Sequence, residues 1–221
     1  LLLHKVADPS DLRITEIFYS LQGESSTVGY PTVFVRLTGC PLRCVYCDSA
    51  YAFKGGQRMT LESVLNEVAS YHPRYVTVTG GEPLAQPACI ELLKQLCDAG
   101  YFVSIETSGA LDIAPIDQRV MTVMDWKTPE SGEMHRNRMA NVDYLKPSDQ
   151  VKYVISSRED YEWSKSSMIE HGFIDRCEVL FSPVYEKLQP QCLADWIVED
   201  RIAVRFQFQL HKLLWSDEPG R

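Results

Sequence analysis

Apolar and polar positions alternate along much of the chain with the period of two that is typical of β-strands. β-branched and aromatic residues concentrate in short stretches that polar or turn-forming residues bound. The clearest alternation is the last one, in which Val204, Phe206 and Phe208 are separated by Arg205 and Gln207. We predict seven strands, over residues 12–18, 32–38, 74–79, 101–107, 120–126, 177–181 and 202–210.

Between these stretches apolar residues recur at helical spacing. The best example begins at Leu61, directly after Thr60, a residue type that commonly caps a helix N-terminus. A second helix begins at Pro87 and ends at Gly100, in keeping with the positional preferences of proline and glycine. We predict two further helices over residues 158–170 and 190–199.

Alternating strands and helices predict a parallel sheet with right-handed crossovers in an α/β fold. The number of elements is too small for a complete eightfold barrel. We therefore expect a single domain over residues 1–221 that forms a partial or irregular (β/α) TIM-like barrel, with an open doubly wound sheet as the alternative. Both architectures carry their chemistry at the carboxyl ends of the strands. The polar stretch 128–147 predicts a long loop.

Charge and hydropathy limit the partners of the chain. The 221 residues contain 22 Lys and Arg against 30 Asp and Glu, a formal net charge of −8. This balance argues against a nucleic-acid-coating protein and against a polybasic membrane binder. No apolar run approaches the roughly 18 residues that span a bilayer. We expect a cytoplasmic protein with neither nucleic acid nor membrane as its partner.

Three of the seven cysteines lie close together after the predicted strand 32–38, at Cys40, Cys44 and Cys47. In a reducing compartment such a group indicates metal or redox chemistry, whereas a structural disulfide is unusual there. Three thiolates can hold a four-iron cluster and leave one iron open to a ligand. A structural zinc site needs a fourth ligand, and no second cysteine pair or spaced histidine pair follows.

The spacing Cys-x3-Cys-x2-Cys, with the aromatic Tyr46 before the last cysteine, resembles the radical S-adenosylmethionine enzymes. The resemblance implies a [4Fe–4S] cluster on Cys40, Cys44 and Cys47, with S-adenosylmethionine chelated at the open iron. Its cleavage would give a 5′-deoxyadenosyl radical that removes a hydrogen from the substrate. The resemblance implies no catalytic residue beyond this cofactor radical.

Further residues that follow predicted strands extend the resemblance. Gly80, Gly81 and Glu82 match the GGEP motif that holds the methionine amino group in these enzymes. With Tyr46, these residues and others after later strands make up the implied S-adenosylmethionine contacts. The later ones are Ser108, Asp125, Trp126, Lys127 and Ser182.

Within that superfamily the chain looks like a 7-carboxy-7-deazaguanine synthase from about Ile14 onward. The segments that carry this resemblance include 21–24, 47–49 and 209–212. It implies a carbon–nitrogen lyase that converts 6-carboxy-5,6,7,8-tetrahydropterin to 7-carboxy-7-deazaguanine with loss of ammonia, a step toward queuosine and other deazapurines. The implied substrate contacts are Leu21, Gln22, Gly23, Glu24, Arg36, Thr79 and His211.

The same resemblance implies a magnesium ion and two protein partners. Magnesium would bind the substrate oxygens and the hydroxyl of Ser49, where threonine is commoner in the family. The expected partners are an electron donor such as flavodoxin and a second copy of the chain in a homodimer. Two alternatives stay open: a glycyl-radical-enzyme activase, and a zinc- or iron–sulfur-containing binding module without enzymatic activity.

Overall fold

A nine-stranded sheet forms the centre of the computed structural model, which describes residues 11–216, 218 and 220. The strands follow the order β3-β1-β2-β4-β5-β6-β7-β8-β9 across the sheet, which is not closed into a complete barrel. They are β1 (Leu12–Leu21), β2 (Pro31–Leu37), β3 (Gln57–Met59), β4 (Tyr75–Gly80), β5 (Phe102–Thr107), β6 (Met121–Asp125), β7 (Gln150–Ile155), β8 (Glu178–Pro183) and β9 (Arg205–Phe206).

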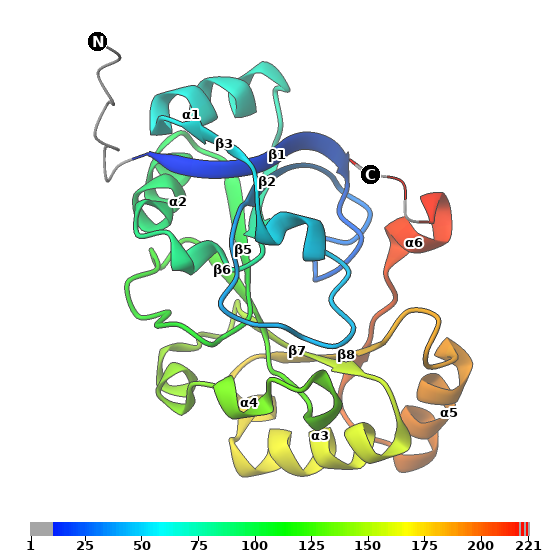
Figure 1. Ribbon diagram of the computed structural model, residues 1–221. Helices are drawn as coiled ribbons and strands as arrows, with labels where there is room; N and C mark the ends of the chain where they lie inside the picture. The colour runs from blue at the N-terminus through cyan, green and yellow to red at the C-terminus, as the bar shows by residue number, and fades with distance from the viewer. Residues whose placement is uncertain (1–10, 217, 219, 221) are drawn as a thin grey trace.

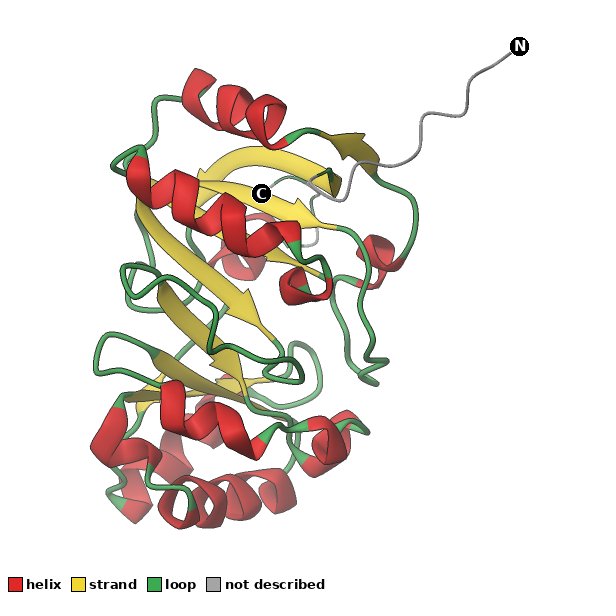
Figure 2. Ribbon diagram, turned by 90° about the vertical axis from the view of Figure 1, so that its left-hand side faces the viewer, coloured by secondary structure: helices red, strands yellow, loops and turns green. Residues whose placement is uncertain are grey.

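Six α-helices accompany the sheet within the described residues, with α1 and α2 beside its first half and α3 to α5 beside its second half (Figures 1 and 2). The predicted N-cap is confirmed, because Thr60 Oγ1 accepts a hydrogen bond from Ser63 N at 3.1 Å. The helices are α1 (Leu61–Ser70), α2 (Ala88–Asp98), α3 (Arg158–Glu170), α4 (Phe173–Arg176), α5 (Pro190–Asp200) and α6 (Leu210–Trp215).

The predicted α/β partial barrel is confirmed, with one difference in strand direction. All neighbouring pairs from β2 to β9 are parallel, whereas β1 pairs antiparallel with both β2 and β3. The connection from Leu21 to Pro31 contains no helix, and a parallel pair needs a long crossover that such a short connection cannot supply. The residues after β1 therefore leave the sheet at the end opposite to the carboxyl ends of the parallel strands.

The predicted set of strands needs three corrections. The sequence pattern missed β3 and β7, and the predicted strand 202–210 is wrong except for Arg205–Phe206. Only Leu180 and Phe181 of β8 pair with this segment. Beyond Phe206 the side chains of Gln207 and Gln209 bond to the connection after β1 instead, and the chain enters α6 at Leu210.

The segment 128–147, expected as a long loop, contains no strand and no α-helix. It is built from three 3-10 helices, at Pro129–Ser131, Met134–Arg136 and Met139–Tyr144. Asn141 fastens it from within, since its side-chain amide donates to the carbonyl oxygens of Gly109 and Leu111. The segment thus packs on the loop that follows β5.

The core lies between the sheet and its helices. Buried side chains from α1 and α2, among them Val64 and Leu92, pack on the apolar faces of β2, β4 and β5. Aromatic residues fill the second half, where the Trp126 and Phe173 rings meet edge to face at 5.1 Å. No helix among the described residues has the length and apolar character needed to cross a bilayer.

Candidate active site

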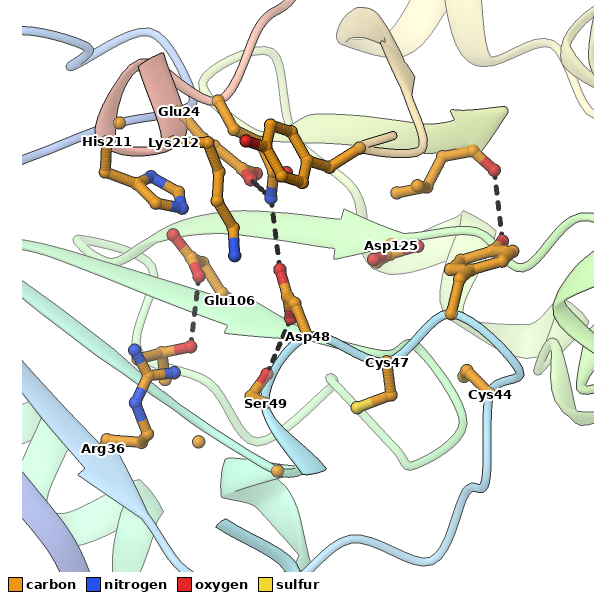
Figure 3. A pocket seen from close by; sticks show the side chains of 18 of the residues that line it. Glu24, Arg36, Cys44, Cys47, Asp48, Ser49, Glu106, Asp125, His211 and Lys212 are labelled. Carbon is orange, nitrogen blue, oxygen red and sulfur yellow. Dashed lines mark hydrogen bonds between the residues drawn. The ribbon is translucent and has the colours of Figure 1, made fainter. Parts of the chain in front are cut away.

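A cavity of about 820 Å³ lies inside the partial barrel, a volume within the usual range for ligand sites. Figure 3 shows its two ends: Arg36, Glu106 and His211 lie at one, and Cys44, Cys47 and Asp125 lie toward the other. The wall includes most of the residues that the sequence predicted to bind the cluster, the cofactor or the substrate. They are Leu21, Gln22, Gly23, Glu24, Arg36, Cys40, Cys44, Tyr46, Cys47, Ser49, Thr79, Gly80, Gly81, Ser108, Asp125, Lys127 and His211.

The cysteine loop leaves the carboxyl end of β2 and lies tightly against the end of β4. A Cβ atom at Gly81 would stand 2.4 Å from the Gly39 carbonyl oxygen and 2.7 Å from Cys40 Cβ, so only glycine fits there. The loop is fixed on its other side by Tyr46, whose hydroxyl donates to the Val154 carbonyl oxygen at 3.1 Å. The three cysteines are thereby presented to one cavity.

All three thiols are free and half-buried at the cavity wall. Burial raises the pKa of each, to about 11 for Cys44, so the thiols are neutral without a positively charged partner. Bound iron would draw off these protons. Within residues 11–216, 218 and 220, no three His, Cys, Asp or Glu residues converge on a single-ion position. Soft thiolates that open on a large cavity instead fit an iron–sulfur cluster.

The cofactor side of the cavity offers matched charges. Lys127 Nζ lies 3.0 Å from Asp125 Oδ2. Burial alone would lower the pKa of Lys127, but the charge of Asp125 and its hydrogen bond to Lys127 oppose burial, and the value is raised. Asp125 Oδ1 is buried and has no hydrogen-bond partner among the described residues. This acceptor and the Lys127 ammonium fit a ligand with hydroxyl or amino donors and a carboxylate, as S-adenosylmethionine has.

Three predicted cofactor residues lie outside the cavity wall, so the structure does not support direct contact for them. Trp126 is 1% exposed and packs on Phe173 and His171, because it points to the opposite face from its neighbours Asp125 and Lys127. Ser182 is buried behind the wall that Pro183 and Val184 form.

Glu82 is the third, and its buried carboxylate organises the end of β5 instead. It accepts hydrogen bonds from Thr107 Oγ1 at 2.9 Å and from Ser108 N at 2.7 Å. It also caps its own turn by accepting from Leu84 N at 3.0 Å. Glu82 therefore acts on the cavity through Ser108, which does line it.

The residues after β1 form the floor of the cavity. Because Leu21 pairs with Pro31 at the beginning of β2, the connection enters from the amino ends of the parallel strands. It runs beneath the barrel, where Ser26 N donates to Gln150 Oε1 at the first residue of β7. Gln22, Gly23 and Glu24 therefore lie at the edge opposite to the carboxyl ends of the parallel strands, where we expected the chemistry, because β1 is antiparallel to β2.

Arg36 and Glu106 define the polar wall above this floor. Arg36 Nε lies 2.7 Å from Glu16 Oε1, and its guanidinium lies over the Phe18 and Tyr51 rings. Glu106 accepts from Thr79 Oγ1 at 3.1 Å and from Gln22 Nε2 at 3.3 Å. Burial, and then the charge of Glu24, raises the pKa of Glu106.

Helix α6 closes the cavity on the remaining side. The backbone N–H of Leu210 donates to the Gly23 carbonyl oxygen at 3.0 Å, which brings His211 directly against Gly23. Burial lowers the pKa of His211. Gln209 Nε2 donates to Glu24 Oε1 at 2.8 Å and to Asp48 Oδ2 at 3.2 Å. Asp48 in turn accepts from Ser49 Oγ at 2.9 Å.

Sequence reasoning missed several wall residues, among them Lys152. Its strand alternates cleanly, with Val151, Tyr153 and Ile155 in the core, so the period-two pattern was present. Phe18, Phe34, Asp48 and Gln209 lie in or beside segments that were recognised without being assigned to the cavity. No local pattern distinguishes such wall residues from other strand residues.

Comparison with known proteins identifies the family to which this chain belongs. Residues 34–121 match the model described as the Radical SAM superfamily. The chain is 43% identical over 210 residues to the 7-carboxy-7-deazaguanine synthase of Chlorobaculum tepidum, covering 94% of this chain and 96% of that protein. The chain belongs to the 7-carboxy-7-deazaguanine synthase family. The resemblance noted in the sequence is thereby confirmed.

Other family members and a solved structure agree. The synthase of Koribacter versatilis is 43% identical over 222 residues, which cover 94% of this chain and 98% of that protein. The crystal structure of QueE from Escherichia coli has the same fold, with a TM-score of 0.71 at 19% identity over 91% of this chain and 95% of that one. The cofactors of this family are a [4Fe–4S] cluster and S-adenosylmethionine.

Proposed function

We propose that the protein converts 6-carboxy-5,6,7,8-tetrahydropterin to 7-carboxy-7-deazaguanine, with release of ammonia, in the biosynthesis of queuosine and other deazapurines. The observation that supports this most is the pairing of two sets of side chains in one cavity. Cysteine thiols and Lys127 line one end, and Glu24, Glu106 and Arg36 line the other. The radical S-adenosylmethionine family and the synthase relatives give the reaction class.

The chemistry of the wall suits a carboxylated pterin. The 2-amino-4-oxopyrimidine edge of a pterin carries adjacent N–H donors, and Glu24 on the floor and Glu106 on the wall can accept hydrogen bonds from them. Arg36 offers a guanidinium to a carboxylate, and Phe18 and Phe34, stacked at 5.0 Å, offer an apolar surface to a flat ring. The cluster and S-adenosylmethionine, when bound, would supply the radical that removes the substrate hydrogen. The chain's own residues hold both molecules in one orientation and exclude water.

Magnesium is part of the proposal on the strength of Ser49 and Asp48. The Ser49 hydroxyl lies at the cavity wall beside the Asp48 carboxylate, and magnesium prefers such oxygen ligands. We expect Ser49→Ala to weaken the dependence of turnover on magnesium concentration. An unchanged magnesium response would remove Ser49 from the site.

Two partners and a compartment complete the proposal. A one-electron donor such as flavodoxin would reduce the cluster, and a second copy of the chain would form a homodimer. The seven free cysteines suit a reducing compartment, which favours the cytoplasm. No observation favours the activase or the non-enzymatic binding module.

The decisive experiment is anaerobic reconstitution followed by product analysis with the pterin substrate. We expect wild type to bind iron and sulfide in a cubane stoichiometry and to release the deazaguanine. Cys44→Ala should lose the cluster while circular dichroism stays unchanged. Cys192→Ala, which changes an exposed cysteine on α5, is the matched control and should retain both. Full turnover by Cys44→Ala would contradict the assignment.

A further inference from the structure

Lys152 connects the two ends of the cavity. It lies in the middle of β7, with its side chain 12% exposed, and its Nζ is 2.6 Å from Glu24 Oε2 and 3.8 Å from Asp125 Oδ2. Glu24 belongs to the floor and Asp125 to the cofactor side. A single ammonium group therefore faces carboxylates from both.

Lys152 and the carboxylates around it stabilise each other's charges. Burial alone would lower the pKa of Lys152, but the charges of Glu24, Asp125 and Glu106 raise it, so it carries its proton throughout the physiological range. In return Lys152 opposes the burial that raises the pKa of Glu106. The charged and titratable groups near it are Glu24, Arg36, Asp48, Glu106, Asp125, Lys127, His211 and Lys212.

Glu24 is fixed before any ligand arrives. Its Oε2 accepts from Lys152 and its Oε1 accepts from Gln209, while its backbone N–H donates to Gln22 Oε1 at 3.1 Å. Each carboxylate oxygen retains a second lone pair that can accept from a ligand.

We propose that Lys152 is a positioning residue, whose ammonium keeps Glu24 an aligned acceptor for a ring edge with adjacent N–H donors. The inference rests on the proposed function for the identity of that ring. Lys152 also sets the position of the Glu24 carboxylate relative to Asp125. The substrate ring and the cofactor are therefore held at a fixed position relative to each other. The residue thus contributes to specificity for a 2-amino-4-oxopyrimidine over a ring that presents acceptors at this edge.

The test measures binding of 6-carboxy-5,6,7,8-tetrahydropterin by calorimetry, from about pH 6 to about pH 9. It uses cluster-loaded protein with S-adenosylmethionine and without reductant, so that no turnover occurs. Lys152→Met removes the cation that opposes the burial of Glu106, so the pKa of Glu106 rises further. We expect affinity to fall roughly tenfold near neutral pH and to recover as pH rises. Ligand binding to this variant should release a proton to the buffer.

Matched variants separate this role from a loss of packing. Lys152→Arg keeps the charge and should keep the wild-type pH profile. Lys165→Met removes a lysine that also bridges two carboxylates, Glu162 and Asp200, on the outer surface, and should change nothing. An equal loss of affinity at every pH for Lys152→Met, or no loss, would overturn the proposal.

A double variant keeps the test decisive if Lys152→Met does not fold. Lys152→Met combined with Glu24→Gln removes the unpaired carboxylate, so it should fold, bind weakly at every pH and release no proton. Recovery of its affinity at high pH would also count against the proposal. Product formation by wild type is measured in parallel. A wild type that makes no deazaguanine refutes the proposed function. An active wild type, together with pH-insensitive binding by the single variant Lys152→Met, refutes the role of Lys152 alone.

Discussion

At the scale of single residues, Gly23 lies so close to His211 that a methyl group added there would disturb the substrate end of the cavity. A Cβ atom there would stand 2.1 Å from His211 Nδ1, far inside van der Waals contact. Gly23→Ala must therefore displace the imidazole from the cavity wall. We expect KM for the pterin to rise roughly tenfold, as expected for a lost binding contact of about 1.4 kcal/mol, with little change in unfolding temperature. Steady-state kinetics and thermal denaturation measure both.

The background of His211→Ala provides the control for this prediction. Without the imidazole there is nothing for the methyl group to displace. Adding Gly23→Ala to His211→Ala should therefore cause no further rise in KM. A full additional rise would show that the glycine acts through its own backbone and not through His211.

Residue spacing brought out the three cysteines, which line one cavity, whereas it also singled out Trp126, which does not. The cysteines follow from a local pattern that the chemistry of a cluster requires. Trp126 was assigned by proximity to Asp125 and Lys127, although alternation along an extended segment turns consecutive side chains to opposite faces. Glu82 shows a different limit, since its buried bonds to Thr107 and Ser108 join positions far apart in the sequence.

At the scale of elements, the close approach of β4 to the cysteine loop is the feature on which cluster binding depends. Gly80 and Gly81 lie so near to Leu37 and Gly39 that neither position has room for a Cβ atom. We expect Gly81→Ala to push the loop away from β4 and to lower the iron and sulfide content after anaerobic reconstitution, while circular dichroism remains that of wild type. A full iron complement in this variant would contradict the prediction.

Strand prediction located most of the sheet but failed for β3, for β7 and for most of the segment 202–210. β2, β4, β5, β6 and β8 were all located to within a few residues. β7 was missed although it is as long as β4 and its buried side chains alternate, because it follows a polar segment with prolines. The pattern at 202–210 was clear, yet period two describes only side-chain direction and does not supply a neighbouring strand to pair with.

At the scale of the whole molecule, the open sheet is joined across its gap by individual hydrogen bonds, most of them from side chains, instead of strand pairing. Gln207 Oε1 accepts from Ser25 N at 2.9 Å, and Gln209 reaches Glu24. These bonds link the segment after β9 to the connection after β1, across 182 residues of sequence in the case of Gln207. No local pattern can predict such a closure, because it depends on the complete curvature of the sheet.

Substitution of Gln207 tests whether the hydrogen bond between Ser25 and Gln207 helps to hold the partial barrel together. Gln207→Leu would leave the buried Ser25 N–H without its acceptor, which costs about 1–3 kcal/mol for an unsatisfied buried group. Because the connection after β1 is also the cavity floor, the loss should raise KM for the pterin more than KM for S-adenosylmethionine. Denaturant unfolding and steady-state kinetics measure the two effects. Gln95→Leu on α2, whose amide bonds to Glu91 of the same helix, is the control and should change neither. Equal rises in both KM values would mean that the floor does not depend on this bond.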